Sequence, residues 1–273
     1  MSRVTDLQQT MLATISRFSM VHPGDKVLVA LSGGPDSVTL LHALWTAREE
    51  LGITLLAAHL NHSIRGRESD KDAEYASEFA ASLGVECTVE KIDVPEIRKS
   101  LRLSEEETAR IVRYDFLERT AANTGCSRIA VAHNADDQVE TVILNVLRGT
   151  GLDGLSGMPP VRGQIIRPLI DVKRSQIEAY IEEHNLSPRT DLTNLEPKYT
   201  RNRVRLKLLP FLREEFNTNV DAAILRIAEL ARVDSTYLNI ETESALARSA
   251  TQRAEGTISI DAESIIHLPL AIR

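Results

Sequence analysis

Six consecutive residues near the start of the chain combine backbone freedom, hydroxyl groups and a carboxylate. They are Ser32, Gly33, Gly34, Pro35, Asp36 and Ser37. Glycines let the backbone approach a ligand closely, and backbone N–H groups and serine hydroxyls are donors that suit an anion. The pattern predicts a phosphate-binding loop. It is not a Walker loop, because the chain contains no glycine-lysine-serine or glycine-lysine-threonine ending with the required spacing.

The carboxylate of Asp36 restricts what this loop can bind. A negative side chain inside a phosphate site repels the ligand unless a divalent cation lies between them. We therefore expect Asp36 to be a ligand of Mg²⁺. The alternative is a polar turn that merely closes a strand, which short glycine-containing turns often do.

The loop requires a strand before it and a helix after it. Residues 27–31 are a continuous apolar run, typical of a strand buried on both faces. Residues 38–50 have helical apolar spacing, and Gly52 follows where a left-handed C-terminal cap is expected. A helix that begins directly at the loop directs its positive dipole end and its free N–H groups toward the bound anion.

In this context, the sequence Ser-Gly-Gly-Pro-Asp-Ser resembles the pyrophosphate loop of the N-type ATP pyrophosphatases. Members of that superfamily cleave ATP between the α- and β-phosphates, transfer AMP to a substrate oxygen, and let a nucleophile displace the AMP. The resemblance implies that residues 32–37 bind ATP.

Two further polar clusters follow predicted strands, at residues 59–65 and 133–141. Ligands of open parallel sheets bind at the carboxyl ends of strands, so both clusters are candidates for the same site. In the helix predicted for residues 135–148, a period of 3.6 is expected to turn Glu140 away from the sheet. The residues expected to face the sheet are Val139, Val142, Ile143, Val146 and Leu147. Asp137, in the first turn, is expected to hold Mg²⁺ or orient the reacting base, and His133 to balance charge on the α-phosphate. A first-turn aspartate that only complements the helix dipole is the alternative.

Two arginines lie off the apolar face of the helix predicted for residues 104–124, which Ser104 is expected to cap. Arg110 and Arg113 have side chains long enough to reach a phosphate or a nucleobase. A surface ion pair accounts for Arg110 equally well and for Arg113 less well, so Arg113 is the expected nucleotide ligand.

The alternation of strands and helices predicts an α/β fold, a doubly wound parallel sheet with right-handed crossovers. Residues 1–212 are expected to form the catalytic domain. Residues 213–273 are expected to be a helical connector and the start of a truncated C-terminal region. Asp171 is expected to cap a helix over residues 172–185, and residues 149–160 are expected to form a mobile loop beside the site.

Composition limits the class of protein. The chain has 273 residues, a net charge of −7 and two separated cysteines, which together favour a cytoplasmic protein without disulfides, iron–sulfur clusters or a membrane span. The acidic total argues against general nucleic-acid binding, but residues 198–213 carry six basic residues and no acidic one. That stripe fits either a solvated helix face or an RNA contact.

Several motifs in order narrow the resemblance to one family. HLNHSIRGRESDKD, EETARIVRYDFL, AHNADDQVETVILNVLRGTGLDGLSGMPP, RPLI and DLTNLEPKYTRNRVRLKLLP, together with the loop, resemble the bacterial tRNA(Ile)-lysidine synthetases over residues 26–212. The resemblance implies ATP-dependent adenylation of C2 of the wobble cytidine in a tRNA(Ile) with a CAU anticodon, followed by attack of free L-lysine. Family members carry further C-terminal tRNA-binding structure, and we expect this structure to be short or absent here.

The resemblance also implies roles for individual residues. The reaction centre is expected to contain Asp36, His133 and Asp137. The residues expected to contact the tRNA or other substrates are Asn61, His62, Arg65, Glu140, Arg201, Asn202 and Arg205. The sequence leaves open whether the protein is a homodimer.

Two other functions remain open at this point. A tRNA thiolase of the same superfamily would need cysteines arranged for sulfur transfer, and Cys87 and Cys126 form no such arrangement in the sequence. A nucleotide- or tRNA-binding module without catalysis would keep the loop. In such a module, replacing Asp137 by asparagine would not change the rate of pyrophosphate release.

Overall fold

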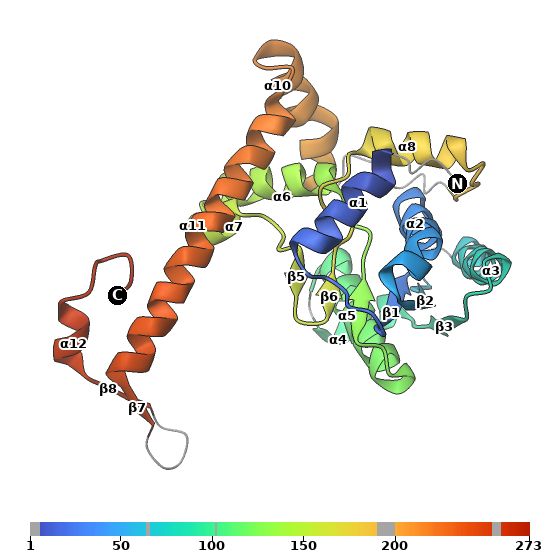
Figure 1. Ribbon diagram of the computed structural model, residues 1–273. Coiled ribbons are helices and arrows are strands. Elements are labelled where there is room, and N and C mark those ends of the chain that lie inside the picture. Colours follow the sequence, from blue (N-terminus) through green and yellow to red (C-terminus); the bar gives the residue numbers. More distant parts are fainter. Residues whose placement is uncertain (1–5, 64–65, 102, 190–199, 253–257) are drawn as a thin grey trace. The chain divides into compact units, whose positions relative to one another are not determined.

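A computed structural model describes residues 6–63, 66–101, 103–189, 200–252 and 258–273 (Figure 1). The chain forms two compact units. Unit 1 comprises Met1–Gln138 and Pro159–Glu196, and unit 2 comprises Val139–Met158 and Pro197–Arg273. The predicted boundary between a catalytic domain, residues 1–212, and a helical connector, residues 213–273, is a functional division and stays a prediction.

Unit 1 is built on a six-stranded sheet with the order β3-β2-β1-β4-β6-β5. Neighbouring strands are parallel except β5 and β6, which pair antiparallel. The apolar run that precedes the glycine loop is β1, near the centre of the sheet. The strands are β1 (Lys26–Ala30), β2 (Thr54–Asn61), β3 (Cys87–Lys91), β4 (Arg128–Ala130), β5 (Val161–Arg162) and β6 (Ile165–Ile166).

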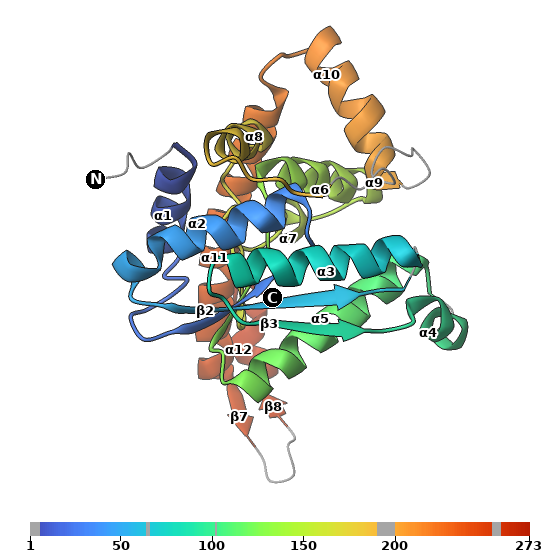
Figure 2. The ribbon, with the colours of Figure 1, turned by 90° about the vertical axis from the view of Figure 1, so that its right-hand side faces the viewer.

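Helices cover both faces of this sheet, which confirms the doubly wound α/β fold. One core joins the sheet to α1 (Asp6–Arg17), α2 (Pro35–Leu51), α3 (Arg67–Ser82) and α8 (Arg174–Glu183). The core on the opposite face joins it to α4 (Val94–Leu101) and α5 (Glu105–Thr124). Figure 2 shows α2 and α3 on one side of the strands and α5 on the other.

Local signals in the sequence agree with most helix ends. Gly52 adopts the left-handed conformation after α2, with a φ of 65°. The Ser104 hydroxyl accepts a hydrogen bond of 3.2 Å from the backbone N–H of Glu107, as expected for an N-cap. The prediction for Asp171 is wrong. Its carboxylate accepts a hydrogen bond from the Thr14 hydroxyl at 3.0 Å, and α8 begins after Lys173.

Unit 2 contains a long helix, α11 (Val220–Ser249), and a set of shorter elements. Helix α6 (Ala135–Arg148) begins in unit 1 and continues into unit 2. Residues 149–160, expected to be a loop, include the short helix α7, and the Ser235 hydroxyl of α11 bonds to Asp153 there. The other elements are α7 (Leu152–Leu155), α9 (Thr200–Arg203), the π-helical turn η2 (Val204–Leu208), α10 (Leu209–Glu215), β7 (Ala250–Gln252), β8 (Ile258–Ile260) and α12 (Ala262–Ile266).

The apolar face of α6 does not pack as the sequence predicted. Val139 and Val142 are buried, but in a core formed with residues of η2, α10 and α11 rather than against the sheet. Val146 and Leu147, expected on the same buried face, are 50% and 64% exposed. A period of 3.6 identifies an amphipathic helix, but it does not identify the surface that the helix packs against.

Candidate functional site

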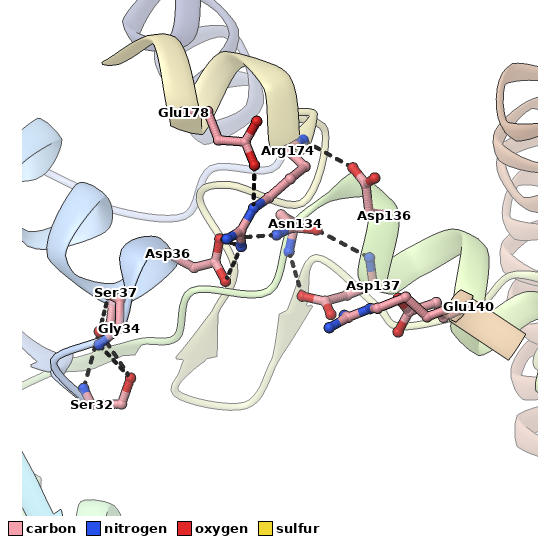
Figure 3. A network of polar contacts seen from close by, with 11 residues as sticks. Ser32, Gly34, Asp36, Ser37, Asn134, Asp136, Asp137, Glu140, Arg174 and Glu178 are labelled. Atoms are coloured by element: carbon pink, nitrogen blue, oxygen red, sulfur yellow. Dashed lines mark hydrogen bonds and ion pairs between the residues drawn. The ribbon is translucent and has the colours of Figure 1, made fainter. Parts of the chain in front are cut away.

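The glycine loop connects the carboxyl end of β1 to the first turn of α2. Pro35 occupies the first turn of the helix, where its missing N–H group costs no hydrogen bond. The hydroxyl oxygens of Ser32 and Ser37 lie 3.0 Å apart, and the Ser37 hydroxyl also accepts a bond of 3.1 Å from the backbone N–H of Ser32 (Figure 3). These bonds hold the loop in a closed turn at the positive end of the α2 dipole.

Gly33 is required by the shape of this loop. Its φ of +87° lies in the region that L side chains rarely adopt, and an added Cβ would lie 3.3 Å from the ring of Tyr75 on α3. The Gly33 carbonyl accepts a hydrogen bond of 3.0 Å from the backbone N–H of Arg189. Arg189 in turn bonds Asp72 and Glu68 of α3 through its side chain. Arg189 therefore ties the loop to α3.

Asp36 faces an arginine from another helix. Nη1 of Arg174, the first residue of α8, lies 2.8 Å and 3.0 Å from the two carboxylate oxygens of Asp36 (Figure 3). Nε of Arg174 bonds Glu178 at 3.2 Å. The side chains of Arg174 and Asp36 are 40% and 30% exposed, so solvent reaches this ion pair.

Asn134 links Asp36 to Asp137. Its side-chain amide donates to Asp36 at 3.2 Å. Its backbone N–H donates to the Asp137 carboxylate at 3.1 Å, and its side-chain oxygen accepts from the Asp137 backbone N–H at 3.0 Å. This reciprocal cap begins α6 and fixes the Asp137 carboxylate. The neighbouring Asp136 has a different role, because it accepts a bond of 2.9 Å from the backbone N–H of Arg174 and anchors the start of α8.

The donor set around Asn134 suits Mg²⁺. Among the described residues no group of three or more histidines, cysteines, aspartates or glutamates could hold a metal ion. Mg²⁺ is usually bound through one or two carboxylates, with waters and substrate phosphates completing the octahedron. Asp36 and Asp137, both bonded to Asn134, supply two carboxylates beside a phosphate loop. The guanidinium of Arg174 at Asp36 shows that this carboxylate accepts a cation as its neighbour.

The cluster at the carboxyl end of β2 contains two histidines, of which His59 is buried within the strand and His62 is half-buried just after it. The His59 ring bonds the Leu31 carbonyl at 2.8 Å, which positions the residue just before the glycine loop. Burial, followed by the charges of Arg113 and His59, lowers the pKa of His62 to about 4, so His62 is neutral at pH 7. Its Nδ1 is buried and has no hydrogen-bond partner within the described part of the chain.

Other predicted site residues occupy definite places in unit 1. The buried Asn61 donates to Asp70 at 2.8 Å and accepts from the Ser63 backbone N–H at 2.9 Å, so its side chain shapes the turn that carries His62. Arg113 is an exposed residue of α5, and His133 lies half-buried in the turn between β4 and α6. Arg65 lies outside the described residues. The roles expected of these residues stay predictions.

In unit 2, Glu140 is paired with two arginines. Its side chain is only 2% exposed, Nε of Arg201 lies 2.7 Å from one carboxylate oxygen, and Nε of Arg205 bonds the other. A buried carboxylate requires such partners, since an unpaired buried charge is costly. Asn202, between the two arginines, is half-buried in α9. Their predicted contact with substrate stays a prediction.

Comparison with protein families decides the class of this site. Residues 5–212 match the family model described as the PP-loop domain. The chain belongs to the PP-loop family. Membership of this family supports ATP binding, and it agrees with the closed serine-glycine turn at the start of α2.

The PP-loop chain also resembles curated bacterial proteins named tRNA(Ile)-lysidine synthase. It is 41% identical over 263 residues to the protein of Clostridioides difficile, covering 96% of this chain and 57% of that protein. Identity to the Clostridium tetani protein is 42% over 233 residues, covering 85% and 50%. Identity to the Caldanaerobacter subterraneus subsp. tengcongensis protein is 38% over 265 residues, covering 97% and 56%. The chain spans about half the length of the curated relatives it matches.

Among solved structures, the fold is similar to that of the U34-tRNA thiolase NcsA from Methanococcus maripaludis. The TM-score is 0.66 at 20% identity, covering 83% of this chain and 78% of that one. At this identity the likeness shows the fold alone. None of the helices in the described ranges has the length and apolar character needed to cross a membrane.

Sequence reasoning assigned no role to two residues that organise this PP-loop site. Asn134 was part of a recognised motif, but nothing in its spacing indicated that its amide joins Asp36 to Asp137. Arg174 follows the last strand of the parallel sheet and begins a helix, and that position at the carboxyl edge was a signal available in the sequence. The incorrect helix start at Asp171 concealed it.

Proposed function

We propose that this chain catalyses ATP-dependent ligation of free L-lysine to C2 of the wobble cytidine in a tRNA(Ile) with a CAU anticodon. The observation that carries the proposal is the network in which Asn134 holds Asp36 and Asp137 together beside the PP-loop. Two carboxylates beside a phosphate loop suit the transfer of a charged phosphoryl group. The names of the relatives give tRNA(Ile) and lysidine, and the similarity to these relatives extends over most of this chain.

The reaction divides into two displacements. In the first, the C2 oxygen of the cytidine attacks the α-phosphorus of ATP, and pyrophosphate leaves. In the second, the ε-amine of lysine attacks C2, and AMP leaves with that oxygen. The product is lysidine, and the amine loses its protons to a base or to solvent.

Residues of this chain have distinct proposed roles in those steps. The loop residues Ser32 to Ser37 bind the pyrophosphate portion of ATP through backbone N–H groups and hydroxyls. Asp36 and Asp137 would hold Mg²⁺, which when bound neutralises phosphate charge. His133 and Arg113 would balance the negative charge that develops on the α-phosphate. The neutral His62 would contact the cytidine through a ring nitrogen.

The thiolase alternative is weakened by the positions of both cysteines. Cys87 is the first residue of β3 and Cys126 precedes β4, so both lie at the amino ends of strands, whereas the PP-loop lies at a carboxyl end. Burial raises the pKa of the Cys87 thiol to about 11, which suppresses the thiolate needed for sulfur chemistry. Cys126 is buried. We propose a cytoplasmic location, which the presence of only two, widely separated cysteines in the sequence favours.

The proposal is tested by pyrophosphate release from ATP with Mg²⁺ and unmodified tRNA(Ile), with and without lysine. Release that requires the tRNA, with lysine incorporated into it, is the expected result. Asp137→Asn is expected to lower the release rate at least about 100-fold while leaving ATP binding measurable, since it removes one proposed metal ligand. The control is Asp115→Asn, which alters an aspartate that is 64% exposed and paired with Arg119.

Two outcomes contradict the proposal. An Asp137→Asn variant that releases pyrophosphate at the unchanged rate removes the assigned role of Asp137. A wild-type chain that binds ATP and tRNA but incorporates no lysine is a binding module, the second function considered above.

A further inference from the structure

Two arginines in unit 1 flank a tyrosine ring on the outer surface of α5 and β5. The guanidinium carbons of Arg110 and Arg162 each lie 5.4 Å from the centroid of the Tyr114 ring. Both arginines are exposed and Tyr114 is half-buried. We call Arg110, Tyr114 and Arg162 the α5–β5 arginine surface. The shared ring holds two positive charges in a defined arrangement at the protein surface.

A third arginine adds positive charge beneath this surface. Arg167 is only 2% exposed, and its Nη1 donates to the Pro159 carbonyl at 2.6 Å, while its Nε is buried without a hydrogen-bond partner. Burial is the main cause that lowers the pKa of Arg167. The side chain of Tyr114 acts against this shift, and the like charges of Arg162 and Arg110 add to it. Arg167 therefore adds its positive charge close to Arg110 and Arg162.

Among the residues that the structure describes, no carboxylate is paired with these three arginines. Another arginine of α5 shows the usual arrangement, because Arg119 pairs with Asp115 at 2.9 Å and with Glu90 at 3.0 Å. On a chain whose net charge is −7, the two exposed arginines, with Arg167 buried beneath them, make this surface locally positive.

We infer that the α5–β5 arginine surface binds the phosphodiester backbone of the RNA substrate, and this inference rests on the proposed function. Several close cations without acidic partners attract a chain of negative charges more strongly than one small anion, because each phosphate releases counterions. Arginine forks match phosphate oxygens in pairs. The sequence left Arg110 open between a phosphate contact and a surface ion pair, and the structure shows no ion pair for it within the described ranges.

The test measures binding of the unmodified tRNA(Ile) transcript to Arg110→Gln and Arg162→Gln between 50 and 200 mM salt, by filter retention. Each variant is expected to bind about three- to tenfold more weakly and to lower the slope of log K against log salt by about 0.7–0.9. Arg119→Gln is the matched control, with an unchanged slope expected. Arg162→Lys, which keeps the charge, is expected to recover most of the slope. ATP affinity is expected to stay the same in all four variants.

The outcomes separate this inference from the proposed function. A wild-type chain that does not bind the tRNA contradicts the proposed function, and the inference with it. If the wild-type chain binds and both glutamine variants keep its affinity and slope, only the inference is overturned. Displacement of the tRNA by polyglutamate of equal charge at equal concentration would also overturn it, because the surface would then suit an acidic peptide.

Discussion

Two carboxylates in this chain are paired with arginines, but their surroundings differ. In unit 1, Asp36 pairs with Arg174, and the two side chains are 30% and 40% exposed. In unit 2, Glu140 is 2% exposed and pairs with both Arg201 and Arg205. Solvent screens the first pair, so its partner can be exchanged at little cost. The second carboxylate has lost its hydration and depends on its arginines.

This difference separates a pair suited to ligand binding from one suited to holding structure. The carboxylate of Asp36 belongs to the predicted phosphate loop, and in our proposal it would exchange the guanidinium of Arg174 for a metal ion. Glu140 on α6 pairs with Arg201 of α9 and Arg205 of η2. Because Glu140 is buried, breaking these pairs would leave an uncompensated charge and lower the stability of the fold. The sequence grouped Glu140, Arg201 and Arg205 as substrate contacts, and their mutual pairing assigns them at least a structural task as well.

The largest effect is expected from the buried carboxylate. Glu140→Gln keeps the size of the side chain but leaves two arginines without their anion, and we expect it to lower the free energy of unfolding by about 2 kcal/mol. Urea denaturation of the whole chain measures this change. Glu215→Gln, at an exposed glutamate of α10, is the control and is expected to change stability little. Equal losses in the two variants would remove the distinction between buried and exposed carboxylates.

The same contrast explains what the sequence could predict. The bounds of α6, residues 135–148, followed from apolar spacing, because periodicity reports directly on helical geometry. The burial of Glu140 did not follow, since its arginines lie 61 and 65 residues further along the chain. The phosphate loop is local, and its residues were identified together. The bond between Asp36 and Arg174 spans 138 residues, and no local pattern encodes it.

A smaller effect is expected from the exposed pair in unit 1. Arg174→Gln removes the cation that competes for Asp36, so the chain without nucleotide is expected to bind Mn²⁺, a spectroscopic substitute for Mg²⁺, about two- to fivefold more tightly. That range corresponds to about 0.4–1 kcal/mol, which lies within the values typical of an exposed ion pair. Electron paramagnetic resonance of free Mn²⁺ measures it without any turnover. Arg174→Lys keeps the charge and is expected to behave as wild type. Weaker Mn²⁺ binding by Arg174→Gln would mean that the arginine positions the Asp36 carboxylate for the metal ion instead of competing with the ion for it.

The smallest effect is expected for the folding stability of Asp36→Asn. In the wild-type chain the Asn134 side-chain amide donates to the Asp36 carboxylate at 3.2 Å, and the asparagine keeps an oxygen that can accept this bond. The substitution therefore removes only a solvent-screened attraction to Arg174. We expect the free energy of unfolding to change by less than about 0.5 kcal/mol under the conditions used for Glu140→Gln. A decrease of about 2 kcal/mol in the free energy of unfolding would show that Asp36 stabilises the fold as much as Glu140 does. An ion pair of that strength would resist displacement by a metal ion. A small change together with weakened Mn²⁺ binding would instead assign the Asp36 carboxylate to the ligand rather than to the fold.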